Sequence, residues 1–236
     1  MKIELWSDYV CPFCYIGKKR LEIAIEQLNL KDEITVELKS YELDPYFDKN
    51  VELKTYDYLK TKYNMSEEKV VEMTRGIEKQ AEELGLKYDF ANMKQQNTFD
   101  AHRLVKFAED AGKGPEMSER LLQAYFTESK EISKPDVLKE LAEEIGLDID
   151  ETARVLCLNN YTKQVKDDIQ VAKEIGVQGV PFFVFGEKYA ISGAQPLEVI
   201  IEVIEKVQAE NKNKPKIQKI NPEGSASYCT GDGCNS

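Results

Sequence analysis

The sequence lacks an excess of positive charge and any long apolar run. Its 236 residues carry 32 Lys and Arg against 43 Asp and Glu, which gives a net charge of −11. This balance excludes a general nucleic-acid binder, because such proteins neutralise phosphates with clustered basic side chains. No run of about eighteen apolar residues is present, so we expect no segment that spans a membrane.

The first residues lack the apolar stretch of a secretory signal. The chain starts MKIELWSDYV, and the acidic Glu4 and Asp8 interrupt its apolar residues. We therefore expect a cytoplasmic protein. In that reducing compartment, paired cysteines are more often catalytic, redox-sensing or metal-binding than structural.

Cysteines are few and odd in number. They are Cys11, Cys14, Cys157, Cys229 and Cys234. An odd count leaves at least one thiol unpaired within the chain, which argues against a purely structural disulfide framework. Cys157, in ARVLCLNN, is interpreted as a small buried hydrophobe.

The hydrophobic pattern predicts an α/β domain that is split by helices. KIELW and EITVELKSYEL have the alternation of strands, and residues 15–28 place apolar side chains at helical spacing. A helix of this length between two strands favours a parallel, right-handed crossover. Residues 55–175 read almost entirely as helices, and VPFFVF, the turn GEK and YAISG predict an antiparallel hairpin before a final helix that opens at Pro196.

The order is thus β-α-β, a helical block, β-β-α and a tail. We expect one split domain from residues 1–45 and 175–210, with residues 46–174 as a large all-helical insertion. Residues 211–236 are rich in Lys, Asn, Pro, Gly and Ser, which predicts a flexible tail.

The pair in CPFC lies where the first strand gives way to the helix. We place Cys11 at the N-cap and Pro12 in the first turn. The positive end of the helix dipole favours a thiolate on Cys11, which predicts that this solvent-facing sulfur attacks disulfides. Cys14, one turn further in, would then resolve the mixed disulfide. Two idle thiols or half of a zinc site are the alternatives, and the β-α-β context favours the redox motif.

Pro181 directly precedes the predicted strand in GVQGVPFFVF. An X-Pro bond at such a place can be cis, and a cis bond would leave the backbone N–H and C=O of Val180 free to pair with a substrate. A trans proline that starts an edge strand is the alternative.

Three segments together resemble the DsbA-like thioredoxin-fold disulfide oxidoreductases, specifically the cytosolic FrnE-like branch. They are SDYVCPFCYIGKKRLE, NTFDAHRL and GVQGVPFFVFGEKYAISGAQP. The resemblance implies a thioredoxin fold with a helical insertion, exchange at Cys11 and Cys14, and a cis bond before Pro181. It also implies that no organic cofactor is used, and that Asn97 and His102 face the active-site cleft.

The sequence departs from better-known relatives of this family at two positions. Phe13 stands where the periplasmic oxidant has a histidine, so we expect a less oxidising pair. Leu5 stands where thioredoxin-like enzymes often bury a carboxylate that handles the resolving thiol's proton. That proton must then move through water, Asp8 or Glu4, and the sequence does not choose among them.

Other aromatic and polar residues near the pair have open roles. Trp6, Tyr9 and Tyr15 are expected to line the cleft together with Phe13, although Trp6 could instead belong to the core. A lone helical histidine such as His102 is usually a packed or capping residue.

The tail ends SYCTGDGCNS, and its glycines allow Cys229 and Cys234 to close a small loop. Some FrnE-like proteins resemble this chain in carrying a second C-terminal pair, and an idle tail is the alternative. A flexible linker of about fifteen residues has a root-mean-square reach of roughly 20 Å, enough to return to the cleft.

The sequence therefore predicts a thiol–disulfide oxidoreductase. We expect protein or small-molecule thiols and disulfides as partners, with glutathione as one candidate thiol, and neither nucleic acid nor membrane. A kappa-type glutathione transferase or isomerase shares the fold, but those enzymes typically keep a Ser at the place of Cys11. A non-enzymatic zinc-binding or chaperone module would use the four paired cysteines as tetrahedral ligands; our prediction assigns no metal.

Overall fold

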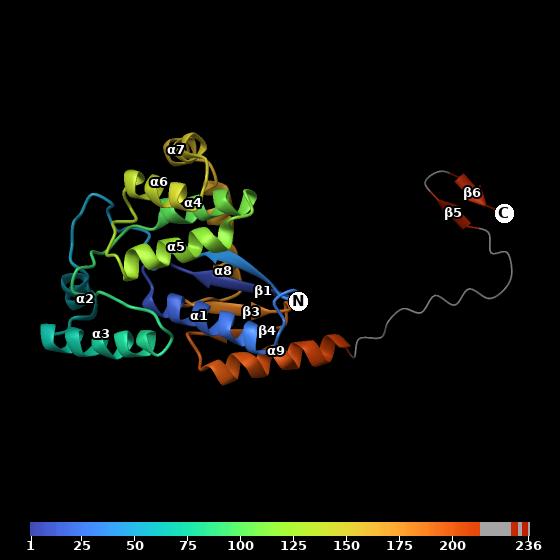
Figure 1. The fold of residues 1–236 in the computed structure, drawn as a ribbon, viewed down its shortest axis with the longest axis horizontal. Helices are drawn as coiled ribbons and strands as arrows, with labels where there is room; N and C mark the ends of the chain where they lie inside the picture. The colour runs from blue at the N-terminus through green and yellow to red at the C-terminus, as the bar shows by residue number, and fades with distance from the viewer. Residues whose placement is uncertain (213–227, 231–232, 236) are drawn as a thin grey trace.

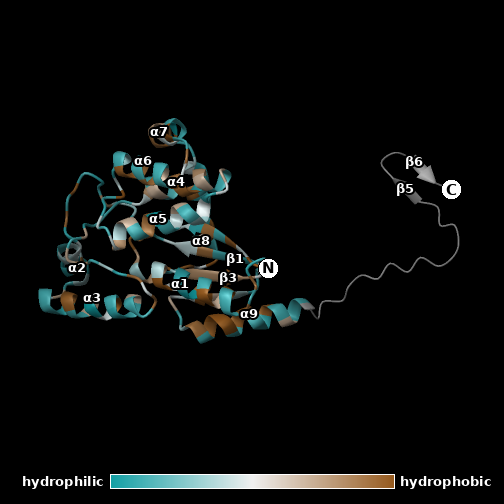
Figure 2. Ribbon diagram, viewed as in Figure 1, coloured by the Kyte–Doolittle hydropathy of each residue, from teal (hydrophilic) through white to brown (hydrophobic). Residues whose placement is uncertain are grey.

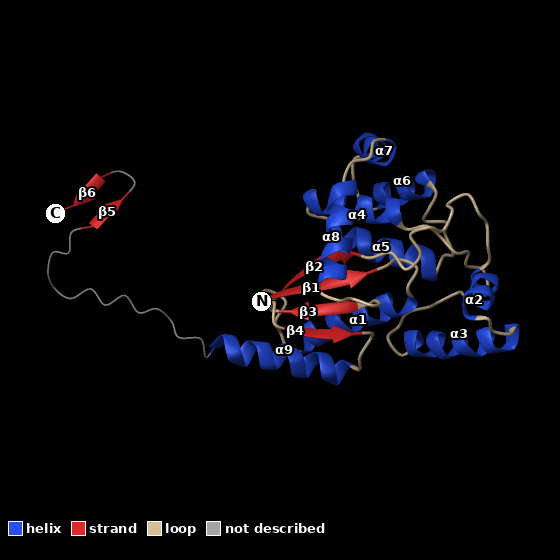
Figure 3. Ribbon diagram, turned by 180° about the vertical axis from the view of Figure 1, so that it is seen from behind, coloured by secondary structure: helices blue, strands red, loops and turns tan. Residues whose placement is uncertain are grey.

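A computed structural model describes residues 1–212, 228–230 and 233–235. Its main sheet has the strand order β2-β1-β3-β4 (Figure 3). The strands are β1 (Lys2–Ser7), β2 (Thr35–Ser40), β3 (Phe182–Phe185) and β4 (Tyr189–Ser192). Strand β1 is parallel to β2 and antiparallel to β3, and β3 pairs with β4 as a hairpin. The predicted parallel connection of the first two strands and the predicted hairpin are confirmed.

Helix α1 (Pro12–Gln27) connects β1 to β2, and α9 (Leu197–Lys212) follows β4. The helices between β2 and β3 are α2 (Thr55–Tyr63), α3 (Glu67–Glu82), α4 (Phe99–Asp110), α5 (Gly114–Phe126), α6 (Pro135–Glu144), α7 (Ile149–Cys157) and α8 (Thr162–Glu174). This element order confirms the predicted thioredoxin-type fold interrupted by a helical block. The domain limits at residues 45/46 and 174/175 stay a prediction.

Alternation along the strands decides which helices cover each face of the sheet. Ile3 and Leu5 point to one face, where they share a buried cluster with Phe183 and with residues of α1 and α9. Trp6 points to the other face and packs with Ala172 of α8. Figures 1 and 3 show the sheet between α1 and α9 on one side and α8 on the other. The period of two in a strand produces this division.

The ends of the helices follow ordinary capping chemistry. Ser66 precedes α3 and its Oγ accepts a hydrogen bond from the Lys69 amide. Beyond the end of α3, Gly85 has a φ of 76°, a conformation that costs glycine little. Figure 2 shows α9 hydrophobic over its first turns and hydrophilic towards its end, so its first part supplies most of the contact with the sheet.

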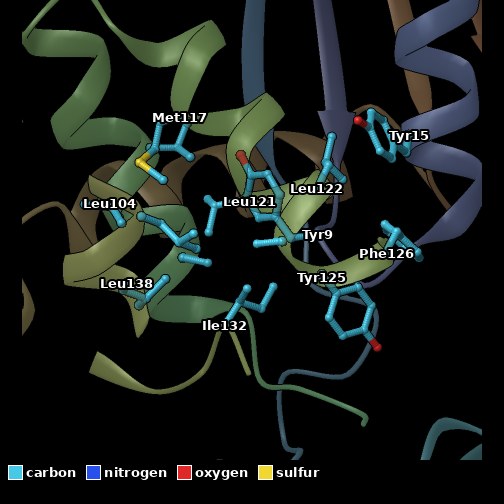
Figure 4. Close-up of a cluster of buried hydrophobic side chains, with 14 of the residues drawn as sticks. Tyr9, Tyr15, Leu104, Met117, Leu121, Leu122, Tyr125, Phe126, Ile132 and Leu138 are labelled. Carbon is cyan, nitrogen blue, oxygen red and sulfur yellow. The ribbon is translucent and has the colours of Figure 1, made fainter. Parts of the chain in front are cut away.

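The inserted helices and the first β-α unit share one hydrophobic core. Tyr9 and Tyr15 belong to the same buried cluster as Leu104, Met117 and Leu122 of α4 and α5 (Figure 4). The Tyr15 hydroxyl also donates to Glu119 on α5 at 2.7 Å, and Lys18 of α1 forms an ion pair with the same carboxylate. The helical block therefore fixes the orientation of α1 as well as covering the sheet.

Gly17 lies where α1 passes the start of β3. A Cβ at this position would stand 2.9 Å from Cγ of Pro181 and 3.1 Å from Cζ of Phe183. Carbon atoms do not approach this closely without displacing their neighbours, so only glycine lets α1 reach the loop before β3.

Among the residues described, the structure contains no helix that is both long and apolar enough to cross a membrane.

We expect Gly17→Ala to destabilise the protein by about 1–2 kcal/mol, because overpacking against Pro181 outweighs the gain in helix propensity. Gly76→Ala is the matched control, since Gly76 lies within α3 and an added Cβ there meets nothing within 4 Å. That change should stabilise the protein by about 0.5–1 kcal/mol. Urea unfolding of both variants measures the difference, and equal effects would contradict the close packing of α1 on Pro181.

Candidate active site around the cysteine pair

The paired cysteines occupy the first turn of α1, as predicted. Cys11 is the N-cap, with extended φ and ψ of −91° and 111°, and Pro12 follows at the helix start. The Cys11 amide donates to the carbonyl of Asp8 at 3.1 Å, and the Cys14 amide donates to the carbonyl of Cys11 at 3.0 Å. These bonds turn the chain from β1 into α1, so both sulfurs stand at the positive end of the helix.

The burial of Cys11 corrects a prediction. Cys11 was expected to face solvent, but it is only 4% exposed and lines a cavity of about 260 Å³. Residues of α2 and α3, among them Leu59 and Met73, form the opposite wall. Sequence patterns do not indicate this cover, because the residues that line the cavity come from segments far apart in the chain.

Cys14 lies behind Cys11 and is fully buried. Burial raises the pKa of the Cys14 thiol, and the neighbouring Cys11 side chain raises it further. The Asp8 amide approaches the Cys14 sulfur at 3.5 Å and acts in the opposite direction, because it donates to the charged form. Cys14 is therefore a protonated thiol that bulk solvent does not reach directly.

The loop before β3 closes the other side of the pair. The Val180–Pro181 bond is cis, as the sequence predicted. The Cys11 thiol donates to the Val180 carbonyl at 3.5 Å, and Val180 lines the same cavity. Gly17 brings Pro181 this close to α1, so the position of Val180 depends on the packing described above.

Asp8 and His102 form a buried polar pair beside the first turn of α1. Asp8 is 1% exposed and His102 is 3% exposed. One Asp8 carboxylate oxygen lies 3.4 Å from Nε2 of His102, and the other accepts a hydrogen bond from the Leu43 amide at 2.7 Å. Burial raises the pKa of the nearby Glu42 carboxyl, and the Asp8 charge raises it further.

The two acidic candidates for proton transfer are placed differently. Glu4 points away from Leu5 along β1 and pairs with Lys2 and Lys39 at 3.4 and 3.8 Å. Leu5 is fully buried in the apolar cluster under α1 and α9. Asp8 is the acidic residue whose own backbone contacts Cys14, so the structure brings Asp8 and not Glu4 to the resolving thiol.

Asn97 and Phe13 occupy separate places. The Asn97 amide group donates to the carbonyl of Phe47 and accepts from the amide of Phe99, so it secures the loop before α4. Phe13 is 38% exposed and lines the cavity beside Cys11.

The other aromatic residues near the cysteine pair do not line the cleft. Trp6 is 1% exposed, and its indole N–H donates to the Asp168 carbonyl of α8 at 3.0 Å. Tyr9 and Tyr15 belong to the shared core, and Tyr9 packs on the His102 ring with a centroid separation of 4.8 Å. The prediction is wrong for Tyr9 and Tyr15, because they pack against the inserted helices, whereas the core position left open for Trp6 is confirmed.

Cys157 also corrects the sequence analysis. It is exposed at the last residue of α7, whereas the sequence predicted a buried position. Helix α7 buries Thr152 and Val155, and Cys157 falls outside that face. The apolar neighbours of Cys157 in ARVLCLNN suggested burial, but they do not show which face of the helix is turned to the core.

Several residues at the site carried no signal in the sequence. The Tyr88 hydroxyl donates to the Pro12 carbonyl at 2.9 Å and so fixes the start of α1 from the inserted block. Thr55, Tyr58 and Met73 line the cavity from α2 and α3. A periodicity pattern marks such residues as helical, but it cannot show which of them face a distant cysteine.

The tail cysteines lie in a short hairpin of β5 (Tyr228–Thr230) and β6 (Gly233–Asn235). Cys229 is directly opposite Cys234 in the antiparallel register. The structure describes only the backbone of these two cysteines. Residues 213–227, the greater part of the predicted flexible tail, lie outside the described residues. The proposed zinc ligands Cys229 and Cys234 therefore have no described geometry. Among the side chains that are described, no group of three or more His, Cys, Asp or Glu could hold a metal ion.

Comparison with known proteins agrees with this architecture. The family model described as a DSBA-like thioredoxin domain matches residues 2–205. The protein YwbO of Bacillus subtilis is 32% identical over 208 residues, which cover 86% of this chain and 94% of that protein. Among solved structures, a probable DsbA oxidoreductase of Streptomyces coelicolor is 32% identical with a TM-score of 0.88, and the match covers 100% of this chain and 99% of that one.

More distant structures share the fold. The cytosolic disulfide reductase DsbM of Pseudomonas aeruginosa is 16% identical with a TM-score of 0.57, and the match covers 91% of this chain and 98% of that one. The match of the family model over most of the sequence, together with the arrangement of sheet, helices and cysteine pair, gives the assignment: this chain belongs to the DSBA-like thioredoxin domain family.

Proposed function

We propose that the protein is a dithiol–disulfide oxidoreductase in which Cys11 attacks and Cys14 resolves. The observation that carries this proposal is the placement of the two sulfurs. Cys11 stands at the N-cap of α1 in the wall of a cavity, and Cys14 lies behind it out of reach of solvent. A substrate disulfide that enters the cavity meets Cys11 first.

The exchange proceeds in two balanced steps. The Cys11 thiolate attacks one sulfur of the substrate disulfide, forms a mixed disulfide and releases the other sulfur as a thiolate. Cys14 loses its proton and attacks the Cys11 sulfur, which closes the Cys11–Cys14 disulfide and releases the second substrate thiolate. Two electrons pass from the pair to the substrate, and the protons of the two cysteines end on the two product thiols. The reverse sequence oxidises a dithiol.

Four protein groups support these steps in the proposal. The Asp8 amide stabilises negative charge on the Cys14 sulfur, because it donates to it. Asp8 and His102 provide the buried acid–base pair through which the Cys14 proton leaves, in place of the carboxylate that Leu5 replaces. The backbone of Val180, beside the Cys11 sulfur, aligns the substrate, and Phe13 contacts it at the mouth of the cavity. The reaction needs no organic cofactor, and we place it in the cytoplasm.

A substitution of each cysteine separates the two roles. We expect Cys11→Ser to abolish reduction of bis(2-hydroxyethyl) disulfide with dithiothreitol as the regenerating reductant, since no attacking thiolate remains. Cys14→Ser should keep the first attack and accumulate a mixed disulfide on Cys11, visible as a mass increase of one substrate thiol. A Cys14→Ser protein that turned over at the wild-type rate, or trapped the thiol at another cysteine, would refute the assignment.

The same preparation discriminates the kappa-type alternative. A glutathione transferase or isomerase would conjugate glutathione to an electrophile, and that activity does not require Cys14. We expect disulfide reduction that depends on both cysteines and no conjugation above the uncatalysed rate.

The tail pair is a separate part of the proposal. Cys229 and Cys234 stand opposite each other in the β5–β6 hairpin, and we propose that they exchange electrons with Cys11 and Cys14. A disulfide that closes so small a loop adds little stability, which makes a redox use the better explanation of the pair.

Removal of residues 225–236 tests this role. We expect the shortened protein to keep its melting temperature and the reduction potential of the Cys11–Cys14 pair, but to change its turnover with a disulfide substrate. A full-length Cys229→Ser/Cys234→Ser variant is the control and should show the same change. Identical turnover in all three proteins would show that the tail is idle.

A further inference from the structure

The cavity that contains Cys11 has mainly apolar walls. Its volume is about 260 Å³, slightly below the range of about 300–1,000 Å³ that is typical of small-molecule sites. Leu59 of α2, Met73 and Ile77 of α3, and Phe90 and Met93 of the following segment form the side opposite the cysteine. Cys11 is only 4% exposed, so a substrate disulfide reaches its sulfur through the cavity, which favours a small molecule over a disulfide on the surface of a folded protein.

One buried polar atom in this cavity lacks a hydrogen bond of good geometry. Thr55 is 5% exposed, and its Oγ1 makes no such bond with any residue that the structure describes. Burial raises the pKa of the Tyr125 phenol, and the Thr55 side chain lies close enough to that hydroxyl to lower the pKa by a smaller amount. Buried hydroxyl groups are nearly always paired, since an unpaired one has lost its hydrogen bonds to water. Thr55 lines the cavity, so a bound ligand is positioned to supply the missing partner.

Tyr125 provides a second polar group at the same place. Its ring belongs to the shared core, and Figure 4 shows its hydroxyl turned away from the other side chains of that cluster. Tyr125 lines the cavity, and burial raises the pKa of its phenol, which keeps it a neutral hydrogen-bond donor. The hydroxyls of Thr55 and Tyr125 therefore offer one donating and accepting site within walls that are mainly apolar, with Tyr58, Lys62 and Gln95 among the other polar lining residues.

The charges at the rim do not favour a polyanionic ligand. Lys62 is the cationic residue that lines the cavity, and its ammonium already donates to the Tyr58 hydroxyl at 2.7 Å. Tyr58 in turn donates to the Asp44 carboxylate at 2.8 Å. The whole chain has a net charge of −11, which repels anions further.

We propose, on the basis of the function proposed above, that the substrate is a small organic thiol or disulfide with an apolar body next to its sulfur. One hydrogen-bonding group on that body pairs with Thr55 and Tyr125. The apolar walls would accept an aliphatic or aromatic group, whereas a peptide thiol with several charges, such as glutathione, lacks matching partners. The exchange itself is the two-step reaction given above, with the reduced Cys11–Cys14 pair as the electron donor.

Single-turnover oxidation of the reduced full-length protein tests this substrate class. The probes are bis(2-hydroxyethyl) disulfide, benzyl 2-hydroxyethyl disulfide, its 4-hydroxybenzyl analogue, glutathione disulfide and insulin. Formation of the Cys11–Cys14 disulfide is followed by acid quench and mass spectrometry, and each rate is divided by the rate of the same probe with dithiothreitol. We expect the corrected rate of the benzyl probe to exceed those of the hydroxyethyl and glutathione disulfides at least tenfold.

Substitutions locate the preference in the cavity. Met73→Trp fills it and should bring the benzyl-to-hydroxyethyl ratio close to one. Glu72→Trp adds the same side chain to the exposed side of α3 and should leave that ratio unchanged. Thr55→Val should remove the advantage of the 4-hydroxybenzyl probe over the benzyl probe. Leu59→Trp serves as a second filling variant if Met73→Trp fails to fold.

The outcomes separate this proposal from the one on which it rests. Corrected rates within twofold for the benzyl, hydroxyethyl and glutathione probes, or a fastest rate with insulin, would overturn the substrate class and leave the oxidoreductase function standing. An unchanged ratio in the filling variants would overturn it too. A pair that no disulfide oxidises would refute the oxidoreductase function itself.

Discussion

The contact between the first turn of α1 and the backbone of Val180 is the constraint on which the site depends. Gly17 allows α1 to lie against Pro181, and this packing holds the Val180 carbonyl 3.5 Å from the Cys11 sulfur. The sheet supplies both partners, because β1 leads into α1 and β3 begins directly after Pro181. Two segments 169 residues apart in sequence are thereby brought to one sulfur atom.

The helical insertion gives this pair its surroundings. Helices α4 and α5 share a core with Tyr9 and Tyr15, so the insertion fixes the orientation of α1, and α2 and α3 cover Cys11. The consequence is an asymmetry between the two thiols. Cys11 lines a cavity, whereas Cys14 is surrounded by protein. The Asp8 amide approaches the Cys14 sulfur, and burial raises the pKa of the Cys14 thiol. Such an asymmetry is what attack by one sulfur and resolution by the other require.

Local sequence predicted those features that local physics determines. The alternation in KIELW and FFVF, the position of Pro12 at the start of α1, and the cis bond before Pro181 follow from patterns within a few residues, supported by the family resemblance. The features it missed depend on long-range packing. Tyr9 and Tyr15 were expected in the cleft and lie in the core, and Cys157 was expected in the core and lies at the surface. Thr55 and Met73 line the same cavity as Cys11, and no periodicity in the sequence indicates that they share it.

Selective alkylation tests the central claim that Cys11 is the reacting sulfur and Cys14 the protected one. A Cys157→Ser/Cys229→Ser/Cys234→Ser protein keeps only the two thiols of the pair. Brief treatment of its reduced form with iodoacetamide at neutral pH, followed by peptide mass spectrometry, gives the extent of modification at each. The account predicts that Cys11 is modified first while Cys14 stays a thiol. Preferential modification of Cys14 would contradict it.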